Sequence, residues 1–250
     1  MPVHALVFDL FDTLVDLPMD ALPRVEIAGR AIPSTVGALH ATFSARHAIA
    51  LEPFAAALRD IDRTWRASHW ERGHELATTE RFARLLAQLG VAPDADLVAR
   101  LTDVHMGLLA GLARTPPHHA ALLARLRERF RTGLCSNFSY APTARSILDA
   151  AGLTRSLDAI VISHEHGLRK PRREIFESTL EVLGVAPDEA IHVGDNLDAD
   201  VAGASAVGLR TVWITRCVRD PGAALAAHRG PPPTWQIDDL AELEAIVAES

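Results

Sequence analysis

Several short apolar segments of this 250-residue chain end in side chains that can do chemistry. Asp9 ends one segment and Ser136 ends another, while Asp195 and Asp200 follow a third. Carboxylates brought together repel and raise one another's pKa values unless a cation lies between them, and such oxygen ligands suit Mg²⁺. With a hydroxyl and an ammonium such as that of Lys170 beside the cation, the set could hold a dianionic phosphoryl group. These residue types predict phosphoryl transfer.

Lys170 stands out because it is the only lysine, all other members of the 25 Lys and Arg residues being arginines. It occurs in the stretch GLRKPRREIF. A lysine ammonium is a compact point charge, which the planar guanidinium of arginine does not supply. We therefore expect a site that requires this ammonium.

The elements that must position these groups follow from periodicity. Short apolar segments alternate with helical patterns of about ten residues, which predicts βαβ units and an α/β fold with a doubly wound, Rossmann-like parallel sheet. The carboxyl ends of parallel strands share one edge, so Asp9, Ser136 and Asp195 can converge there. The expected strands are residues 5–9, 132–136, 158–163, 190–195 and 211–215, with a weak strand near 235–237.

The pattern is different between the first strand and the rest of the sheet. Residues 16–33 carry three prolines and a glycine and are expected to be irregular. Helical periodicity then continues with no strand-like alternation to about residue 112. We therefore predict a helical domain at residues 17–113, inserted into a core formed by residues 1–16 and 114–250. Its expected helices cover about 34–47, 52–70, 79–89 and 93–112.

Four motifs in order, DLFDTL, CSN, KP and GDNLDAD, resemble those of the haloacid dehalogenase superfamily of hydrolases, in particular members with a helical cap inserted after the first motif. The resemblance implies that Asp9 is the nucleophile and forms a covalent aspartyl intermediate, which splits one displacement into two easier ones. It further implies that Ser136 and the Asn137 backbone hold the phosphoryl oxygens. Lys170 would neutralise both the nucleophile and the transferring group.

The resemblance also implies a metal site. Asp9, Asp195 and the carbonyl of Phe11 would ligate Mg²⁺, with Asp200 as a further ligand or as a support behind the ligands. Thr13 would steady the turn at the substrate site.

One position departs from the pattern of the phosphatases. They carry a second aspartate two residues after the nucleophile, which protonates the leaving group, and this chain has Phe11 there. A general acid is worth roughly 10²–10⁴ in rate. One interpretation is a phosphohydrolase whose leaving group needs no acid, such as an acyl phosphate, or whose acid comes from the cap, from His164 or His166, or from the substrate.

Two other interpretations remain open. A 2-haloacid dehalogenase displaces halide at carbon and needs no leaving-group acid, although such enzymes work without the metal that Asp195 suggests. The third interpretation is a binding or regulatory protein with this fold and little turnover.

Substrate choice is expected to depend on the inserted helices. The stretch ASHWERGHELATT, residues 67–79, concentrates polar and aromatic side chains around Gly73. We expect some of them, Arg72 and His74 in particular, to face the substrate once the inserted domain covers the site.

Composition limits the class of partner. The net charge of −7 and the pI of about 5.9 argue against nucleic-acid binding. Two cysteines are too few for a disulfide framework, no basic leader precedes the first apolar run, and no run approaches the ~20 residues of a membrane span. We expect a cytoplasmic monomer or homodimer that acts on a small-molecule substrate, without a nucleic-acid or membrane partner.

Overall fold

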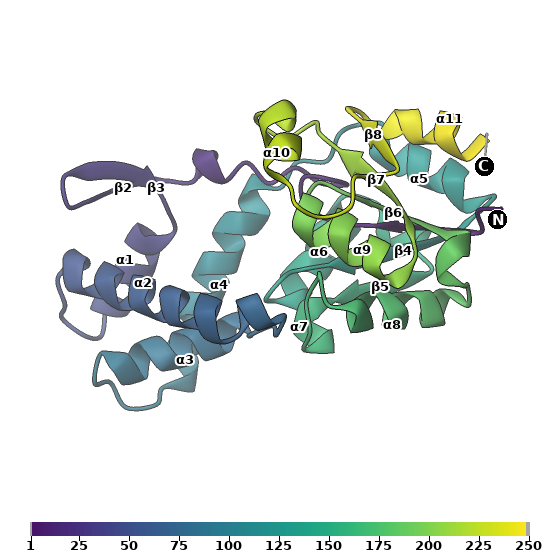
Figure 1. Cartoon of the computed structure of the whole chain (residues 1–250). Coiled ribbons are helices and arrows are strands. Elements are labelled where there is room, and N and C mark those ends of the chain that lie inside the picture. The colour runs from purple at the N-terminus through teal and green to yellow at the C-terminus, as the bar shows by residue number, and fades with distance from the viewer. Residues whose placement is uncertain (1, 249–250) are drawn as a thin grey trace. The chain divides into compact units, whose positions relative to one another are not determined.

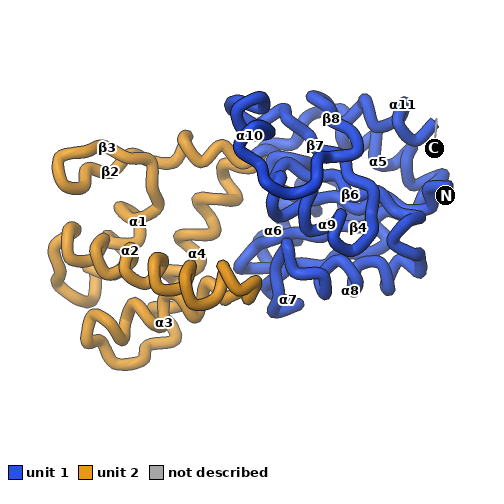
Figure 2. Tube along the Cα trace, viewed as in Figure 1, with its two compact units in different colours: residues 1–16, 114–250 blue, residues 17–113 orange. Residues whose placement is uncertain are grey.

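The computed structural model describes residues 2–248, which divide into two compact units (Figures 1 and 2). Unit 1 consists of Met1–Asp16 and Arg114–Ser250, and unit 2 is the segment Leu17–Ala113. The chain therefore leaves unit 1 after Asp16 and returns to it at Arg114. That unit 2 acts as a cap stays a prediction.

Unit 1 contains a six-stranded, all-parallel sheet with the strand order β5-β4-β1-β6-β7-β8 (Figure 1). The central strand β1 pairs with β4 and β6, with Phe8 opposite Leu134 on one side and Val193 on the other. This arrangement confirms the predicted α/β fold. The strands are β1 Ala5–Phe8, β4 Arg131–Ser136, β5 Ala159–Ile162, β6 Ala190–Gly194, β7 Arg210–Ile214 and β8 Trp235–Ile237.

Both faces of this sheet are buried, as expected for strands joined by helical crossovers. All four residues of β1 are buried, and alternate ones point to opposite faces. Ala5 and Val7 belong to one core cluster with Ile175 and Phe176 of α8. The helices of unit 1 are α5 His119–Arg127, α6 Ala141–Ala150, α7 Ser163–His166, α8 Arg173–Leu183, α9 Gly203–Val207, α10 Pro221–Ala227 and α11 Leu243–Ala248.

Unit 2 has its own apolar core, to which all four of its α-helices contribute. Large buried side chains such as Phe43, Phe54, Trp65 and Phe82 fill it. The helices are α1 Val36–Ser44, α2 Leu51–Ser68, α3 Thr78–Gln88 and α4 Ala95–Leu112, close to the predicted ranges.

The expectation of an irregular segment at residues 16–33 was wrong in part. Strands β2, Arg24–Ile27, and β3, Arg30–Pro33, form an antiparallel hairpin. Its two-residue turn places Ala28 at φ 51° and Gly29 at φ 74°. Hairpin turns of this kind favour Asn-Gly or Gly-Gly, so an alanine at the first position gives no sequence signal for the turn.

Short helical elements complete the chain. The 3₁₀ helices are Met19–Ala21, Trp70–Arg72, Thr154–Ser156, Pro187–Glu189 and Leu240–Glu242, and the segment Leu197–Ala202, η5, is a π-helix that runs into α9. The side chain of Asn196 caps η5 by accepting hydrogen bonds from the Asp198 and Ala199 amides.

No helix among residues 2–248 combines the length and the apolar character needed to cross a membrane.

Candidate active site

Three neighbouring strands of unit 1 deliver polar residues to one edge of the sheet. Asp9 follows β1, Ser136 ends β4, and Asp195 follows β6, in the spatial order β4-β1-β6. The Asp9 amide donates to the Val193 carbonyl at 2.9 Å, which continues the β1–β6 ladder up to the nucleophile position. The structure therefore brings these three predicted site residues to the same edge.

Lys170 lies inside this group and is only 3% exposed. Its Nζ is 2.6 Å from Asp9 Oδ1 and 2.5 Å from Asp200 Oδ1. Asn137 holds the lysine backbone in place: its Oδ1 accepts from the Lys170 amide at 2.8 Å and its Nδ2 donates to the Lys170 carbonyl at 3.0 Å. The peptide between Lys170 and Pro171 is cis. The Asn137 side chain thus holds the backbone of Lys170, whose ammonium contacts Asp9 and Asp200.

Asp200 accepts hydrogen bonds from three donors. Besides Lys170, its Oδ1 accepts from His192 Nε2 at 2.9 Å, and its Oδ2 accepts from the Asn196 amide at 3.0 Å. Both carboxylate oxygens are thus engaged by protein groups. This favours the second of the two expectations for Asp200, a support behind the metal ligands.

Gly194 lets the β6 strand pass close to this carboxylate. A Cβ at Gly194 would lie 2.3 Å from Asp200 Cγ, a distance that no side chain tolerates. The glycine of the GDNLDAD motif is therefore a packing requirement of the buried aspartate.

The buried charges are out of balance. Burial raises the pKa of Asp9 to about 6, although the charge of Lys170 opposes this shift. Burial, together with the charges of Asp200 and Asp9, raises the pKa of Asp195 to about 8. Burial would also raise the pKa of Asp200, but Lys170 and His192 hold it below its ordinary value. One ammonium does not compensate three carboxylates, so the group is suited to a further cation.

The donor set fits a hard divalent cation. Asp9, Asp195 and Asp200 each offer an oxygen, and these oxygens all lie within 4.8 Å of one another. Mg²⁺ prefers oxygen ligands and uses few protein carboxylates. Because the oxygens of Asp200 are engaged elsewhere, Asp9 and Asp195 are the carboxylates that would hold the ion. The role predicted for the Phe11 carbonyl is not tested by these contacts.

Two buried hydroxyls point to a ligand as well. Thr13 Oγ1 and Ser136 Oγ are buried, and neither has a hydrogen-bond partner within residues 2–248. Buried polar atoms are nearly always paired, so unpaired ones at a strand edge call for a bound group. In the turn that contains Thr13, the Leu14 and Val15 amides donate to the Leu10 carbonyl, and the role of Thr13 in steadying this turn stays a prediction.

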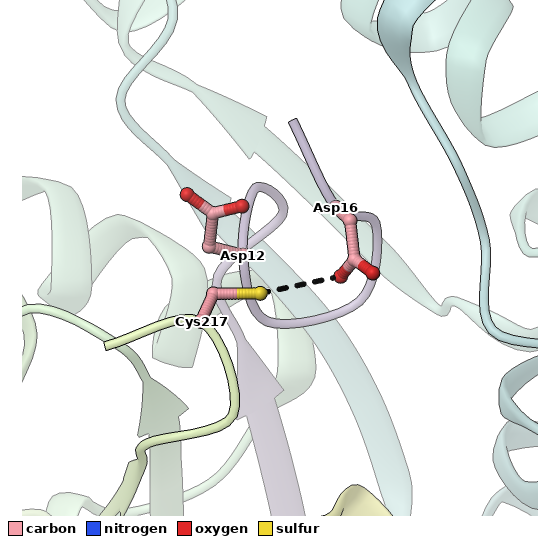
Figure 3. A group of neighbouring side chains, drawn as sticks. All are labelled: Asp12, Asp16 and Cys217. Carbon is pink, nitrogen blue, oxygen red and sulfur yellow. Dashed lines mark hydrogen bonds between the residues drawn. The ribbon is translucent and has the colours of Figure 1, made fainter. Parts of the chain in front are cut away.

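Phe11 occupies the place of the missing acid, and its ring lies 4.9 Å from that of Phe138. Asp12, the next residue, has a left-handed backbone with φ 55°. Its carboxylate belongs to a separate group with Asp16 and Cys217, where the Cys217 thiol donates to Asp16 (Figure 3). Asp12 is therefore not one of the three carboxylates whose oxygens lie together around Asp9.

The structure also shows the surroundings of His164 and His166, the two histidines considered as alternative leaving-group acids. His166 Nε2 lies 3.0 Å from the Ser178 hydroxyl of α8, and the His164 ring packs edge-on against Tyr140. Neither histidine is among the residues that contact Lys170 or Asp200 by hydrogen bonds within the described chain. Arg72 and His74 belong to unit 2, so their contact with substrate stays a prediction.

The sequence reasoning missed His192. It is 1% exposed in the middle of β6, where its neighbours are apolar, and it was counted as part of the strand. A polar side chain in a strand buried on both faces needs a partner. That rule could have marked His192 as a partner of a nearby buried acid.

Comparison with known proteins identifies the superfamily that the four sequence motifs resemble. A family model of haloacid dehalogenase-like hydrolases matches residues 3–208. The pyrimidine 5'-nucleotidase YjjG of Escherichia coli (strain K12) is 30% identical over 172 residues, covering 68% of this chain and 70% of its own length.

Two solved structures are similar over the full chain. One is the HAD-hydrolase YfnB of Bacillus subtilis bound to magnesium, with a TM-score of 0.62, 23% identity and 99% of both chains covered. The other is 2-haloacid dehalogenase of Pseudomonas syringae pv. Tomato DC3000, with a TM-score of 0.68, 19% identity and 99% of both chains covered. Because a magnesium-bound hydrolase and a 2-haloacid dehalogenase share this fold, the fold alone does not choose between phosphoryl transfer and halide displacement.

Proposed function

Because the chain belongs to the haloacid dehalogenase-like hydrolases, we propose that it is a Mg²⁺-dependent phosphohydrolase of small phosphorylated metabolites. The observation that carries the proposal is the Asp9–Lys170–Asp200 arrangement beside Asp195, which holds more negative charge than its lysine balances. The similarity to a nucleotidase and to a magnesium-bound relative supports the same class of reaction.

In the proposed reaction an Asp9 oxygen attacks phosphorus, a new bond forms between them, and the bond from phosphorus to the leaving oxygen breaks. Water then attacks the aspartyl phosphate, releases inorganic phosphate and restores the carboxylate. Bound by Asp9 and Asp195, Mg²⁺ would offset the negative charge of carboxylate and phosphoryl group.

The residues around Asp9 are suited to the proposed phosphoryl transfer. Lys170 keeps Asp9 ionised and attracts the phosphoryl oxygens, since its ammonium already contacts Asp9 at 2.6 Å. The unpaired hydroxyls of Thr13 and Ser136 would donate to those oxygens. With Phe11 in place of an acid, the first step favours leaving groups that depart without a proton, such as the carboxylate of an acyl phosphate.

A second candidate is halide displacement from a 2-haloacid. The observation in its favour is the apolar pair of Phe11 and Phe138 in the place of the leaving-group acid. The excess negative charge around Asp195 weighs against it, because a reaction without a metal leaves that charge unbalanced.

The deciding experiment measures phosphate release from acyl phosphates and phosphate esters, with Mg²⁺ and with chelator, for the wild type and Asp9→Asn. Metal-dependent release that disappears in Asp9→Asn is the expected result. Halide release from 2-haloacids without metal would instead establish the second candidate. Ligand binding without either product would leave a binding or regulatory role.

A further inference from the structure

A cavity of about 570 Å³ lies beside the candidate site, entirely within unit 1. Its walls come from the loop that follows β6, from β7, and from α10 with the loop after it. The size is that of a small-molecule pocket. Asp195 lines this cavity and also offers an oxygen within 4.8 Å of an Asp9 oxygen, so one residue belongs to both the cavity and the candidate site.

The walls are fixed by specific contacts. The Trp213 indole donates to the Asp195 carbonyl at 2.7 Å, and its side chain packs with Leu197 and Ala224. The ring nitrogens of His228, another lining residue, lie 3.0 Å from Asp198 Oδ1 and 3.2 Å from the Pro231 carbonyl oxygen. The His228 side chain is 3% exposed. An ordered indole and imidazole therefore frame the space.

Charges of both signs line the cavity. Asp195 belongs to the candidate site, and Cys217, which lies with Asp12 in Figure 3, also lines the space. Arg229 also lines the cavity; its guanidinium donates only to the Ala226 carbonyl, at 3.3 Å, and has no carboxylate partner within residues 2–248. Because Asp198 is paired with His228, Arg229 is the cavity's free cation in the described chain.

We infer that this cavity receives the leaving group of the phosphorylated substrate, and that Arg229 binds a second anionic group on it. The inference rests on the proposed phosphohydrolase function and adds a substrate class to it: phosphate esters whose alcohol or phenol part has an apolar or aromatic body and carries a second anionic group. An apolar body fits against Trp213 and Ala224, and a carboxylate or second phosphate at its far end fits the guanidinium. The α10 segment thus contributes to specificity from within the core unit.

A matched pair of substrates tests the inference. 4-Carboxyphenyl phosphate and phenyl phosphate differ by one carboxylate, and the ratio of their kcat/KM values measures its recognition. We expect Arg229→Gln to lower this ratio about tenfold, the effect of losing a charged hydrogen bond. Arg229→Lys should restore part of it, and Arg219→Gln, an exposed arginine outside the cavity, should leave it unchanged.

Filling the cavity gives an independent readout. Ala224→Phe should raise KM for both aryl phosphates relative to acetyl phosphate, whose leaving group is too small to reach α10. Calorimetry with 4-hydroxybenzoate, the product of the first substrate, should show binding to the wild type that weakens in Arg229→Gln and Ala224→Phe.

The two hypotheses fail in different ways. If the wild type releases no phosphate from any of the three substrates in Mg²⁺, the proposed function fails, and this inference fails with it. If release is metal-dependent but the variants change neither the substrate ratio nor 4-hydroxybenzoate binding, only the inference is overturned. A preference for substrates with a cationic tail would also overturn it.

Discussion

The Nζ atom of Lys170 lies 2.6 Å from Oδ1 of Asp9, and the same ammonium lies 2.5 Å from Asp200. The nucleophile position and the buried support are therefore joined through one cation. Burial would lower the pKa of Lys170, but the charges of Asp200 and Asp9 raise it above its ordinary value, so the lysine stays charged. Its position explains why a chain that otherwise uses arginine retains one lysine.

Replacing Lys170 should be costly even when the charge is kept. In Lys170→Arg the larger planar guanidinium cannot occupy the space between two buried carboxylates, and we expect phosphate release to fall at least ~10²-fold. Arg173→Lys, an exposed change on α8 where Arg173 pairs with Glu177, is the matched control. Activity of Lys170→Arg within about tenfold of the wild type would contradict this account.

Removing the charge tests stability as well. Lys170→Met leaves Asp9 and Asp200 buried without their common cation, and breaking a buried pair typically costs about 3–5 kcal/mol. Urea unfolding should therefore show a lower midpoint for Lys170→Met than for the wild type in chelator. An unchanged midpoint would mean that the carboxylates are solvated or protonated in the folded protein.

His192 should act as a positioning residue through Asp200. His192→Leu removes the 2.9 Å bond to Asp200 Oδ1, and we expect a loss of about 1–3 kcal/mol of stability and about tenfold in kcat with little change in KM. His192→Gln keeps a side-chain N–H at similar reach and should recover part of both. If the leucine and glutamine variants behave alike in kcat, the bond to Asp200 is not what matters.

Much of unit 1 was predictable because its residues carry local signals. The apolar strands β1 and β4 are each followed by a loop or helix pattern, and their parallel pairing necessarily takes Asp9 and Ser136 to one edge. Lys170 was singled out by its rarity and by the KP motif. These inferences needed only strand direction and residue type.

Other features depend on how individual atoms are directed, which spacing does not determine. The spacing from Asp195 to Asp200 is the same whether Asp200 is a metal ligand or a support behind the ligands. Only the hydrogen bonds that Asp200 accepts from Lys170, His192 and Asn196 distinguish these two roles. The α10 helix is seven residues long and starts after the Asp220 cap, too short for a helical period to be recognised. The cavity beside it was therefore invisible in the sequence.

The raised pKa of Asp195 predicts a pH-dependent stability. In the folded protein without metal, its pKa rises from 3.8 to about 8, so between these values the folded state holds a proton that the unfolded state has lost. The contribution of Asp195 to the free energy of unfolding is thus greatest at low pH and is lost as the pH rises toward 8. Asp195→Asn cannot ionise, and in chelator at pH 8 we expect its Tm to exceed that of the wild type by at least ~2 °C.

Scanning fluorimetry in EDTA at pH 5 and pH 8 measures this effect. The advantage of Asp195→Asn should be smaller at pH 5, which is only slightly above the ordinary pKa of 3.8 that the carboxyl has in the unfolded state, and larger at pH 8. An advantage of the same size at both values would point to packing and not to charge. Added Mg²⁺ should stabilise the wild type and leave Asp195→Asn nearly unaffected, since the variant lacks a ligand.

Phe11→Asp should supply the acid that the phosphatase pattern carries and this chain lacks. A carboxyl at this position could protonate an alkoxide leaving group, so we expect hydrolysis of an alkyl ester such as glycerol 2-phosphate to rise about tenfold, below the ~10²–10⁴ of an evolved acid. Acetyl phosphate, which releases a carboxylate, should gain nothing. Phe11→Asn is the control, because it also removes the 4.9 Å ring contact with Phe138, worth about 0.5–1.5 kcal/mol, but introduces no acid. Equal ester rates for the aspartate and asparagine variants would show that the carboxyl at this position does not protonate the leaving oxygen.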